Sequence, residues 1–311
     1  MNSKLFNLAK DRNPVHLRHA FTVLEIMVAM ALTSVIVVAL MTMFNLTQKA
    51  FVENVTQADV MEDGRAALTL LRKEMSLISS SGFARVGKTN IFRDRFVDFN
   101  FYTQMNPSGS LSVRNSINTN TFQTNVMQDV FFLSNVKKTW KGTGYLVGSF
   151  PIVGVPIGTL YRYSRTAHES LLNQEVLYGG FRKAQVANER RIARAVEFTN
   201  LPPVIGGVIH FAVKAYDSEG RLYTAQSNVT NQFQTIRVEN PSYLPTGDYQ
   251  YRFWNKKVPD YLEVELGVLS PDTFERLKLE PDQRRALLFL QRESANIHYF
   301  KQRIPIRTAS R

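Results

Sequence analysis

The sequence predicts an α+β protein in which one long N-terminal helix packs on a mainly antiparallel β head with short helices. Three observations lead to this fold class. Residues 21–44 form an apolar run of membrane-spanning length. Residues 45–82 continue with apolar side chains at helical spacing, as in an amphipathic helix. Residues 83–311 then contain several segments in which apolar and polar residues alternate, as in half-buried strands.

Residues 1–20 form a polar leader with four basic side chains and one acidic side chain. The apolar run 21–44 follows, and at roughly 1.5 Å per residue it is long enough to cross a hydrocarbon core of roughly 30 Å. Residues 45–58 carry only one basic and one acidic side chain. Because basic flanks stay in the cytoplasm, we expect a single pass with the leader inside and residues 45–311 outside.

One carboxylate, Glu25, lies inside the apolar run. A charged side chain within hydrocarbon costs roughly 2.5–3.5 kcal/mol on insertion scales, so an acid in such a segment needs a partner. If the chain is cut between Ala20 and Phe21, the new α-ammonium group stands one helical turn from Glu25, and the same pair can form between two subunits. We therefore predict that Glu25 pairs with an N-terminal amine.

The residues at the start of the apolar run are Ala20, Phe21, Thr22, Val23, Leu24 and Glu25. This pattern resembles the cleavage and methylation signal of type IV prepilins and pseudopilins. Ala20 stands where the family usually has glycine, and Val23 stands where leucine is more common. The resemblance implies a prepilin peptidase that cuts before Phe21 and methylates its amine. It also implies that Glu25 pairs with the N-terminus of a neighbouring subunit during assembly.

Two other interpretations of this segment stay open. A conventional secretory signal has an apolar core of about 7–15 residues and a small-x-small cleavage site. The run here is longer, and no such site follows it. A simple signal anchor would let Glu25 reach the interface, because this residue is near one end of the span. Neither alternative explains the spacing between the phenylalanine and the glutamate.

The stretch GRAALTLLRKEMSLISSSG predicts the amphipathic part of the long helix. Its apolar side chains recur at three- and four-residue steps, at Ala67, Leu68, Leu71, Met75 and Ile78. Gly64 is expected to weaken or kink this helix. The serines 79–81 followed by Gly82 supply the stop signal. We therefore expect one nearly continuous helix from Phe21 to about Ser81.

The head is expected to consist mostly of strands. The clearest are VIHFAVKAYD (208–217) and DYLEVELGVL (260–269), whose alternating side chains suit a half-buried sheet. Shorter candidate strands are residues 96–102, 129–135, 159–164, 195–200, 249–254 and 297–306.

Short helices and loops are expected between these strands. Ser270 followed by Pro271 predicts one helix, and Pro281 predicts the start of a second. Polar or glycine-rich composition predicts three loops, over residues 106–125, 141–158 and 239–248.

Charge and cysteine content narrow the function classes. The 311-residue chain has no cysteine, which excludes a disulfide framework and a thiolate metal site. The formal net charge is +12, and the leader contributes four basic minus one acidic charge, or +3, which leaves +9 for the rest. A basic surface attracts nucleic acid, acidic polymers or anionic headgroups. Basic residues scattered over the surface, which only keep the protein soluble, would give the same net charge.

No catalytic constellation is evident. The five histidines lack metal-ligand spacing, and they are His16, His19, His168, His210 and His298. The segment GTGYLVG lacks the dinucleotide-binding spacing, and neither a nucleophile elbow nor a phosphate loop occurs. Asp59, Glu62 and Asp63 are close enough in sequence to share a cation, but on a helix they form a solvated acidic face. We therefore predict no enzyme activity, no cofactor and no bound metal.

The order of parts also resembles the J-type minor pseudopilin of type II secretion and the W-type minor pilin. The segments that carry this resemblance are GRAALTLLRKEMSLISSSGF, Tyr161-Arg162-Tyr163, VIHFAVKAYDSEG and VPDYLEVELGVLS. It implies a structural subunit at or near the tip of a type II secretion pseudopilus or a type IV pilus. The implied location is a bacterial inner membrane, with the head in the periplasm, and then the filament.

The implied partners are prepilin peptidase, other pilin or pseudopilin subunits, the inner membrane and its assembly platform. Two other functions stay open. The first is a signal-anchored envelope protein whose head binds a ligand or acts as an enzyme. The second is a pilus-associated protein whose basic head binds nucleic acid or surfaces.

Overall fold

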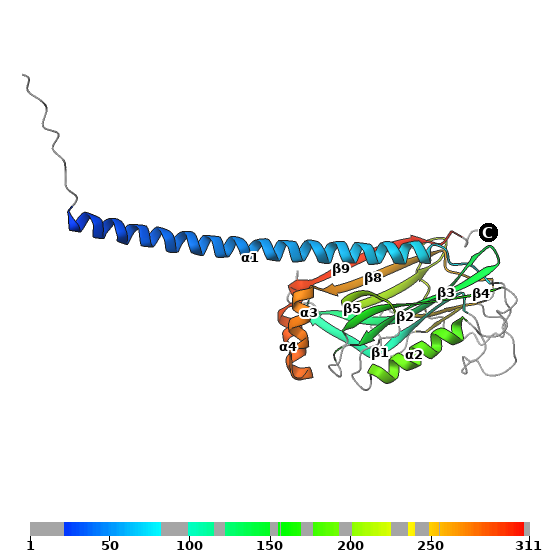
Figure 1. Cartoon of the computed structure of the whole chain (residues 1–311). Coiled ribbons are helices and arrows are strands. Elements are labelled where there is room, and N and C mark those ends of the chain that lie inside the picture. The colour runs from blue at the N-terminus through cyan, green and yellow to red at the C-terminus, as the bar shows by residue number, and fades with distance from the viewer. Residues whose placement is uncertain are drawn as a thin grey trace, which may run out of the picture. The chain divides into compact units, whose positions relative to one another are not determined.

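The computed structural model describes residues 22–81, 99–114, 122–149, 155, 157–168, 177–192, 201–224, 236–239, 249–254 and 256–307. The protein is α+β, with the long helix α1 (Val23–Met75) followed by a β-rich domain (Figure 1). The chain divides into two compact units, Met1–Asn54 and Val55–Arg311. The boundary falls within α1, so the last part of this helix belongs to the β-rich unit.

The β-rich unit is built on one nine-stranded sheet with the order β6-β7-β1-β2-β3-β4-β5-β8-β9, in which all these neighbours pair antiparallel. The strands are β1 Phe101–Arg114, β2 Phe122–Val136, β3 Thr139–Ser149, β4 Gly158–His168, β5 Pro203–Tyr216, β6 Ile236–Glu239, β7 Gln250–Phe253, β8 Tyr261–Leu269 and β9 Ile297–Pro305. The helices are α2 Tyr178–Ile192, α3 Pro271–Lys278, α4 Gln283–Arg292 and the 3-10 turn η2 Ser294–Asn296.

The first part of α1 is apolar and exposed. Every described residue of the first unit, 22–54, is exposed to solvent. Its hydroxyl side chains bond to the helix itself, since Thr33 donates to the carbonyl of Ala29 at 2.7 Å and Ser34 to that of Met30 at 2.8 Å. Among the described residues, α1 is the one helix long and apolar enough to cross a membrane. This helix is therefore compatible with a single-pass membrane anchor.

The second part of α1 packs on one face of the sheet. Its buried residues are Val60, Gly64, Ala67, Leu68, Leu71 and Met75. The predicted apolar stripe is therefore confirmed within the helix. Ile78 is also buried, but it lies beyond the helix and forms a bridge with Ser134 of β2. The predicted extension to about Ser81 is wrong because the backbone after Met75 pairs with β2 instead of continuing the helix.

Helix α2 covers part of the opposite face, as Figure 1 shows. Val130 and Phe132 of β2 face α1, while the alternating Phe131 and Leu133 pack in the cluster that includes Phe181 of α2. The sequence analysis predicts no helix here, and the segment has two glycines after Tyr178 and few apolar residues, both of which disfavour one. The sheet thus has a core on each side.

Two of the predicted loops are largely strand. β1 runs to Arg114 and β2 begins at Phe122, so only the middle of the predicted loop 106–125 lies between them. β3 occupies the whole first half of the predicted loop 141–158. Its glycines accommodate packed rings, since a Cβ at Gly144 would lie 2.3 Å from Phe181. The glycine-rich composition here indicates close packing on a strand and not a loop.

Most other predicted elements are confirmed. The segments 208–217, 260–269, 129–135, 159–164, 249–254 and 297–306 fall wholly or mainly within strands. The two short helices α3 and α4 are present, and the N-cap of α4 is Asp282, which accepts a hydrogen bond from the Arg285 amide at 2.8 Å. The predicted strand 195–200 and nearly all of the loop 239–248 lie outside the described residues.

Gly64 lies where α1 approaches β9. A Cβ at this position would lie 2.3 Å from the ring of Phe300, so the absence of a side chain allows the approach. The helix continues through Gly64 without interruption. The predicted kink is therefore wrong, because close packing with β9 is what requires a glycine here.

A mostly buried carboxylate joins the end of α1 to strands β3 and β4. Glu74, whose side chain is 12% exposed, accepts hydrogen bonds from Arg162 Nε at 3.0 Å and Nη2 at 2.5 Å. It also accepts from the Tyr145 hydroxyl at 2.6 Å and from Lys141 Nζ at 3.0 Å. Burial alone would raise the pKa of Glu74, but the hydrogen bonds from Arg162, Tyr145 and Lys141 lower it to about 2.

Substitution Gly64→Ala tests the packing against Phe300. Alanine favours a helix by roughly 1 kcal/mol, but we expect the clash to lower the free energy of unfolding by about 1–2 kcal/mol. The measurement is urea unfolding followed by tryptophan fluorescence, because both tryptophans, Trp140 and Trp254, lie in the β-rich unit. In a Phe300→Leu background, Gly64→Ala should raise the free energy of unfolding. A rise in the otherwise unchanged protein would contradict the close approach of Gly64 to the Phe300 ring.

The low pKa of Glu74 predicts acid sensitivity. Because the folded-state pKa lies below the unfolded value of 4.5, the stabilisation is present above about pH 4.5 and is lost as the pH falls toward 2. We expect this loss to be on the order of 3 kcal/mol, measured as the free energy of unfolding against pH. Glu74→Gln should flatten the profile and destabilise at neutral pH, whereas Glu62→Gln, an exposed change on the same helix, should do neither. An unchanged profile in Glu74→Gln would disprove this role.

Candidate functional site

Helix α1 begins with a reciprocal pair of hydrogen bonds between Thr22 and Glu25. The Thr22 hydroxyl oxygen accepts from the Glu25 amide at 3.3 Å, and the Glu25 carboxylate accepts from the Thr22 amide at 3.0 Å. The same hydroxyl donates to Glu25 Oε2 at 3.2 Å. This arrangement is a capping box, which satisfies amide groups that the first helical turn leaves without partners.

The capping box holds the Glu25 carboxylate at the start of the helix. An acidic side chain in the first turn is also favoured by the helix dipole. The carboxylate therefore lies at the level of Thr22, the residue directly after Phe21. Ala20 and Phe21, the predicted cleavage pair, lie outside the described residues. The pairing of Glu25 with an amine of Phe21 thus stays a prediction.

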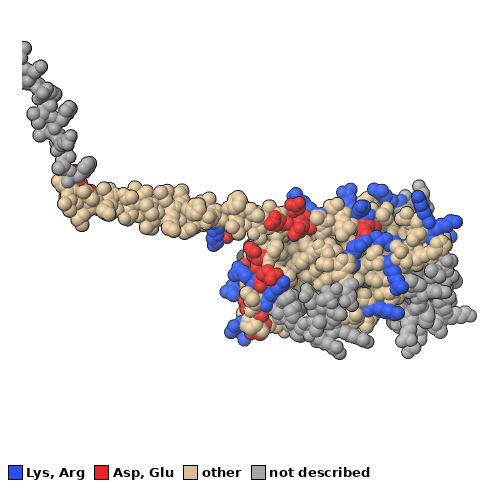
Figure 2. Space-filling view, in the orientation of Figure 1, with Lys and Arg blue, Asp and Glu red and all other residues tan. Residues whose placement is uncertain are grey.

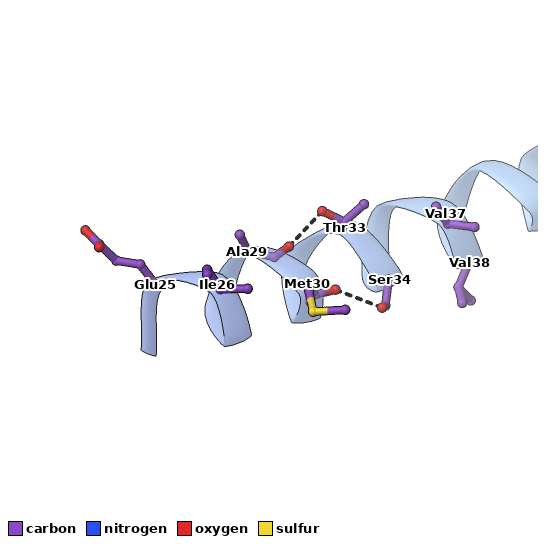
Figure 3. A pocket seen from close by; sticks show the side chains of 8 residues that line it. All are labelled: Glu25, Ile26, Ala29, Met30, Thr33, Ser34, Val37 and Val38. Carbon is purple, nitrogen blue, oxygen red and sulfur yellow. Dashed lines mark hydrogen bonds between the residues drawn. The ribbon is translucent and has the colours of Figure 1, made fainter. Parts of the chain in front are cut away.

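A shallow apolar groove extends from Glu25 along one side of α1 (Figure 3). The residues that line it are Glu25, Ile26, Ala29, Met30, Thr33, Ser34, Val37 and Val38. Ala29 and Thr33 are small and stand one turn apart, and all the lining residues are exposed. Small side chains at this spacing let a second helix approach closely within a membrane. The groove can therefore accept another apolar helix.

The sequence contains a signal for the capping box that the motif-based interpretation did not use. Thr22-Val23-Leu24-Glu25 has the pattern of Ser or Thr followed three residues later by Glu, directly before an apolar run. Thr22 and Glu25 therefore have a local structural role as well as their place in the motif. Val23 and Leu24 form the exposed first turn between them.

The β-rich unit contains one buried histidine beside a carboxylate. His210 of β5 accepts a hydrogen bond from the Val126 amide at its Nδ1 atom, at 3.1 Å, and its Nε2 atom lies 3.5 Å from Glu265 Oε2. Glu265 also accepts from Lys214 and Lys301, each at 3.0 Å. The hydrogen bond from His210 and these two ammonium groups hold the pKa of Glu265 well below its usual range, against the effect of burial.

Both ring nitrogens of His210 thus have protein partners, so this histidine links β5, β2 and β8 and lacks a lone pair for a substrate. His168 and His298 do not join it. Within the described ranges, no three His, Asp or Glu side chains gather where they could hold a metal ion. The acidic residues Asp59, Glu62 and Asp63 are exposed on α1.

Comparisons of this chain with protein-family models, with curated proteins and with solved structures found no match. The functional interpretation therefore rests on the residues and geometry described above. Among them, the start of α1 combines a positioned carboxylate with an exposed apolar helix face, and this is the candidate site.

The capping box predicts an effect of Thr22→Ala on the first turn of α1. Loss of the hydroxyl costs about 1 kcal/mol of helix stability, so the Glu25 amide should exchange its hydrogen several-fold faster. The measurement is hydrogen exchange of the detergent-solubilised protein. Thr22→Ser keeps the hydroxyl and should exchange at the original rate. Equal exchange in all three proteins would rule out the capping box.

Proposed function

We propose that this protein is a structural minor pilin or pseudopilin subunit. In this proposal, prepilin peptidase cuts between Ala20 and Phe21 and methylates the Phe21 amine. The subunit then assembles at or near the tip of a type II secretion pseudopilus or a type IV pilus. The observation that carries the proposal is an exposed apolar helix whose first turn positions a carboxylate directly after the proposed cleavage site.

The energetics of Glu25 explain why cleavage and assembly are coupled in this proposal. A carboxylate within a bundle of apolar helices is costly without a partner. The hydrogen bonds from Thr22 both go to Oε2, and a carboxylate has about four acceptor sites, so Glu25 has the capacity to bind an amine as well. A neighbouring subunit in register brings its N-terminal amine to this carboxylate. A subunit out of register leaves the charge unpaired and is disfavoured.

The packing of the β-rich unit supports a pilin-like fold. The segments that carry the resemblance to minor pseudopilins are far apart in sequence but meet in space. Glu74 of the first segment binds Arg162 of the Tyr-Arg-Tyr segment. The third segment lies in β5 and the fourth in β8, and these two strands pair antiparallel from Val208↔Val268 to Tyr216↔Tyr261. A long helix whose second half packs on such a sheet is the layout that the resemblance implies.

The proposal also assigns partners and location. The peptidase and the assembly platform act at the bacterial inner membrane, which α1 crosses once with its N-terminus in the cytoplasm. The β-rich head lies in the periplasm and then on the filament. Other pilin or pseudopilin subunits contact the groove that begins at Glu25. The protein has a structural role in this scheme, without catalysis and without a cofactor.

The first test is the N-terminal residue of the membrane-extracted protein, determined by intact mass and peptide sequencing with and without prepilin peptidase. We expect a chain that starts at N-methylated Phe21 only when the peptidase is present. A chain that still starts at Met1 would contradict the proposal and favour a signal-anchored envelope protein whose head binds a ligand.

Glu25 variants test assembly separately from cleavage. We expect Glu25→Ala to be cleaved normally and to lose at least ten-fold of its crosslinking to neighbouring subunits in the membrane, since about 1.4 kcal/mol suffices for that factor. The matched control is Glu53→Ala, which removes an exposed carboxylate from the same helix outside the groove and should leave the crosslinking unchanged. Normal crosslinking of Glu25→Ala would show that this residue does not direct assembly.

A further inference from the structure

The end of the β-rich unit at which α1 stops carries a group of basic side chains from four separate segments. We call it the basic end, and its members are Arg72, Lys73, Lys137, Lys138, Lys257 and Arg307. All six side chains are exposed. Figure 2 shows blue side chains gathered toward this end, whereas red and blue mix over α3 and α4 at the other end. Among the described residues none of the six forms an ion pair within 4 Å, and Lys257 is the member that favours the charged form of a nearby carboxyl, that of Asp260.

Hydrogen bonds to the segment 76–81 bring these residues together. The Arg307 amide donates to the Ser76 carbonyl at 3.4 Å. Ser76 follows Arg72 and Lys73 closely in the chain, so Arg307 lies near them. The Ser79 amide donates to the Leu133 carbonyl at 2.9 Å, and this places the β2–β3 turn beside the segment. The Asn100 side chain links Ser81 to the backbone of Lys257, at 3.0 and 2.9 Å. The fold, and not closeness in sequence, therefore brings these six side chains together.

The β2–β3 turn contains an unusual choice of residues. Val136 and Thr139 pair across it, so the turn consists of Lys137 and Lys138 alone, and both have positive φ, at 50° and 67°. Two-residue turns of this type strongly favour Asn-Gly, since few other residues tolerate positive φ. Two adjacent lysines also repel each other. Backbone strain and charge repulsion at an exposed tip indicate a role beyond chain reversal.

We propose that the basic end binds duplex nucleic acid through its phosphate groups, without reading the base sequence. Lysine and arginine side chains that neutralise phosphates release counterions, and this supplies most of non-specific binding. Single strands are bound partly by stacking of their bases on exposed aromatic rings. Among the described residues of the β-rich unit, the exposed aromatic side chain is that of Tyr299. Tyr299 pairs with Gly267 on β8, away from the basic end, so the surface favours a duplex over a single strand.

Two other classes of partner suit this surface less well. Lysine is depleted at protein–protein interfaces, yet four of the six members are lysines. Polybasic segments that bind lipid lie directly beside a membrane span, whereas Arg72 follows the apolar run only after a long polar stretch of helix. The proposal does not depend on cleavage before Phe21, so the two proposals can fail separately.

The test is the binding of a short fluorescent DNA duplex to the full chain in neutral detergent, followed by anisotropy between about 50 and 200 mM salt. With six phosphate contacts we expect log affinity to fall against log salt with a slope of roughly −5. The variant Lys137→Asn with Lys138→Gly should reduce this slope by about two. It should not lower the unfolding temperature, because Asn-Gly is the favoured turn.

The matched control is Arg284→Gln with Arg292→Gln, which removes the same charge from exposed positions on α4. It should leave the slope unchanged. Absence of duplex binding at the lowest salt would overturn the proposal. Equal losses in both variants would overturn the assignment of the site, because net charge alone would then explain the binding. Tighter binding to a single strand, or to vesicles with anionic lipid, would overturn the assignment of the ligand.

Discussion

The arrangement of the β-rich unit depends on the contact between Glu74 and the donors of β3 and β4. The apolar stripe of α1 positions the helix by shape, as at Gly64 against Phe300, whereas a mostly buried carboxylate must also meet specific donors. Arg162 binds Glu74 through two nitrogens, and such a pair has one preferred geometry. This contact, together with the packing of Gly64 on Phe300, positions α1 on the sheet. The segment 76–81 after the helix then joins β2 through Ile78 and Ser79.

The two parts of α1 differ in what surrounds their side chains. Between Val23 and Phe44 the side chains are mostly apolar and exposed, and hydroxyl groups such as those of Thr33 and Ser34 bond to the helix itself, which is compatible with a lipid environment. The carboxylate of Glu25 is held by Thr22 at the start of the helix. In the second unit the helix buries one stripe against strands and presents charge on the other side. Gly64 illustrates the difference, because only close packing against Phe300 explains a glycine within a continuous helix.

Charged groups in the β-rich unit fall into two kinds. Glu263 and Glu265 pair with Lys214 and Lys301, so that two carboxylates meet two ammonium groups in one network. Such a network holds strands together and offers little to a ligand. The basic end is different, since five of its six cations have no anionic partner given by the described residues, Lys257 alone acts on Asp260, and two of the six occupy strained backbone positions. The charges of the Glu265 network are thus compensated within the protein. Those of the basic end are largely not, and this suits the binding of a polyanion.

The sequence by itself determined the elements that depend on local periodicity. The apolar run, the amphipathic stripe of α1 and the alternating strands β5, β8 and β9 follow from neighbouring residues, and so does the Thr22–Glu25 pattern of the candidate site. Only the tertiary structure decided that α1 ends at Met75, that the glycine-rich segment of β3 is a strand, and that a helix covers it at Phe181. These outcomes depend on rings and backbone groups distant in sequence. The basic end has the same origin, because its six residues come from four segments that are distant from one another in sequence.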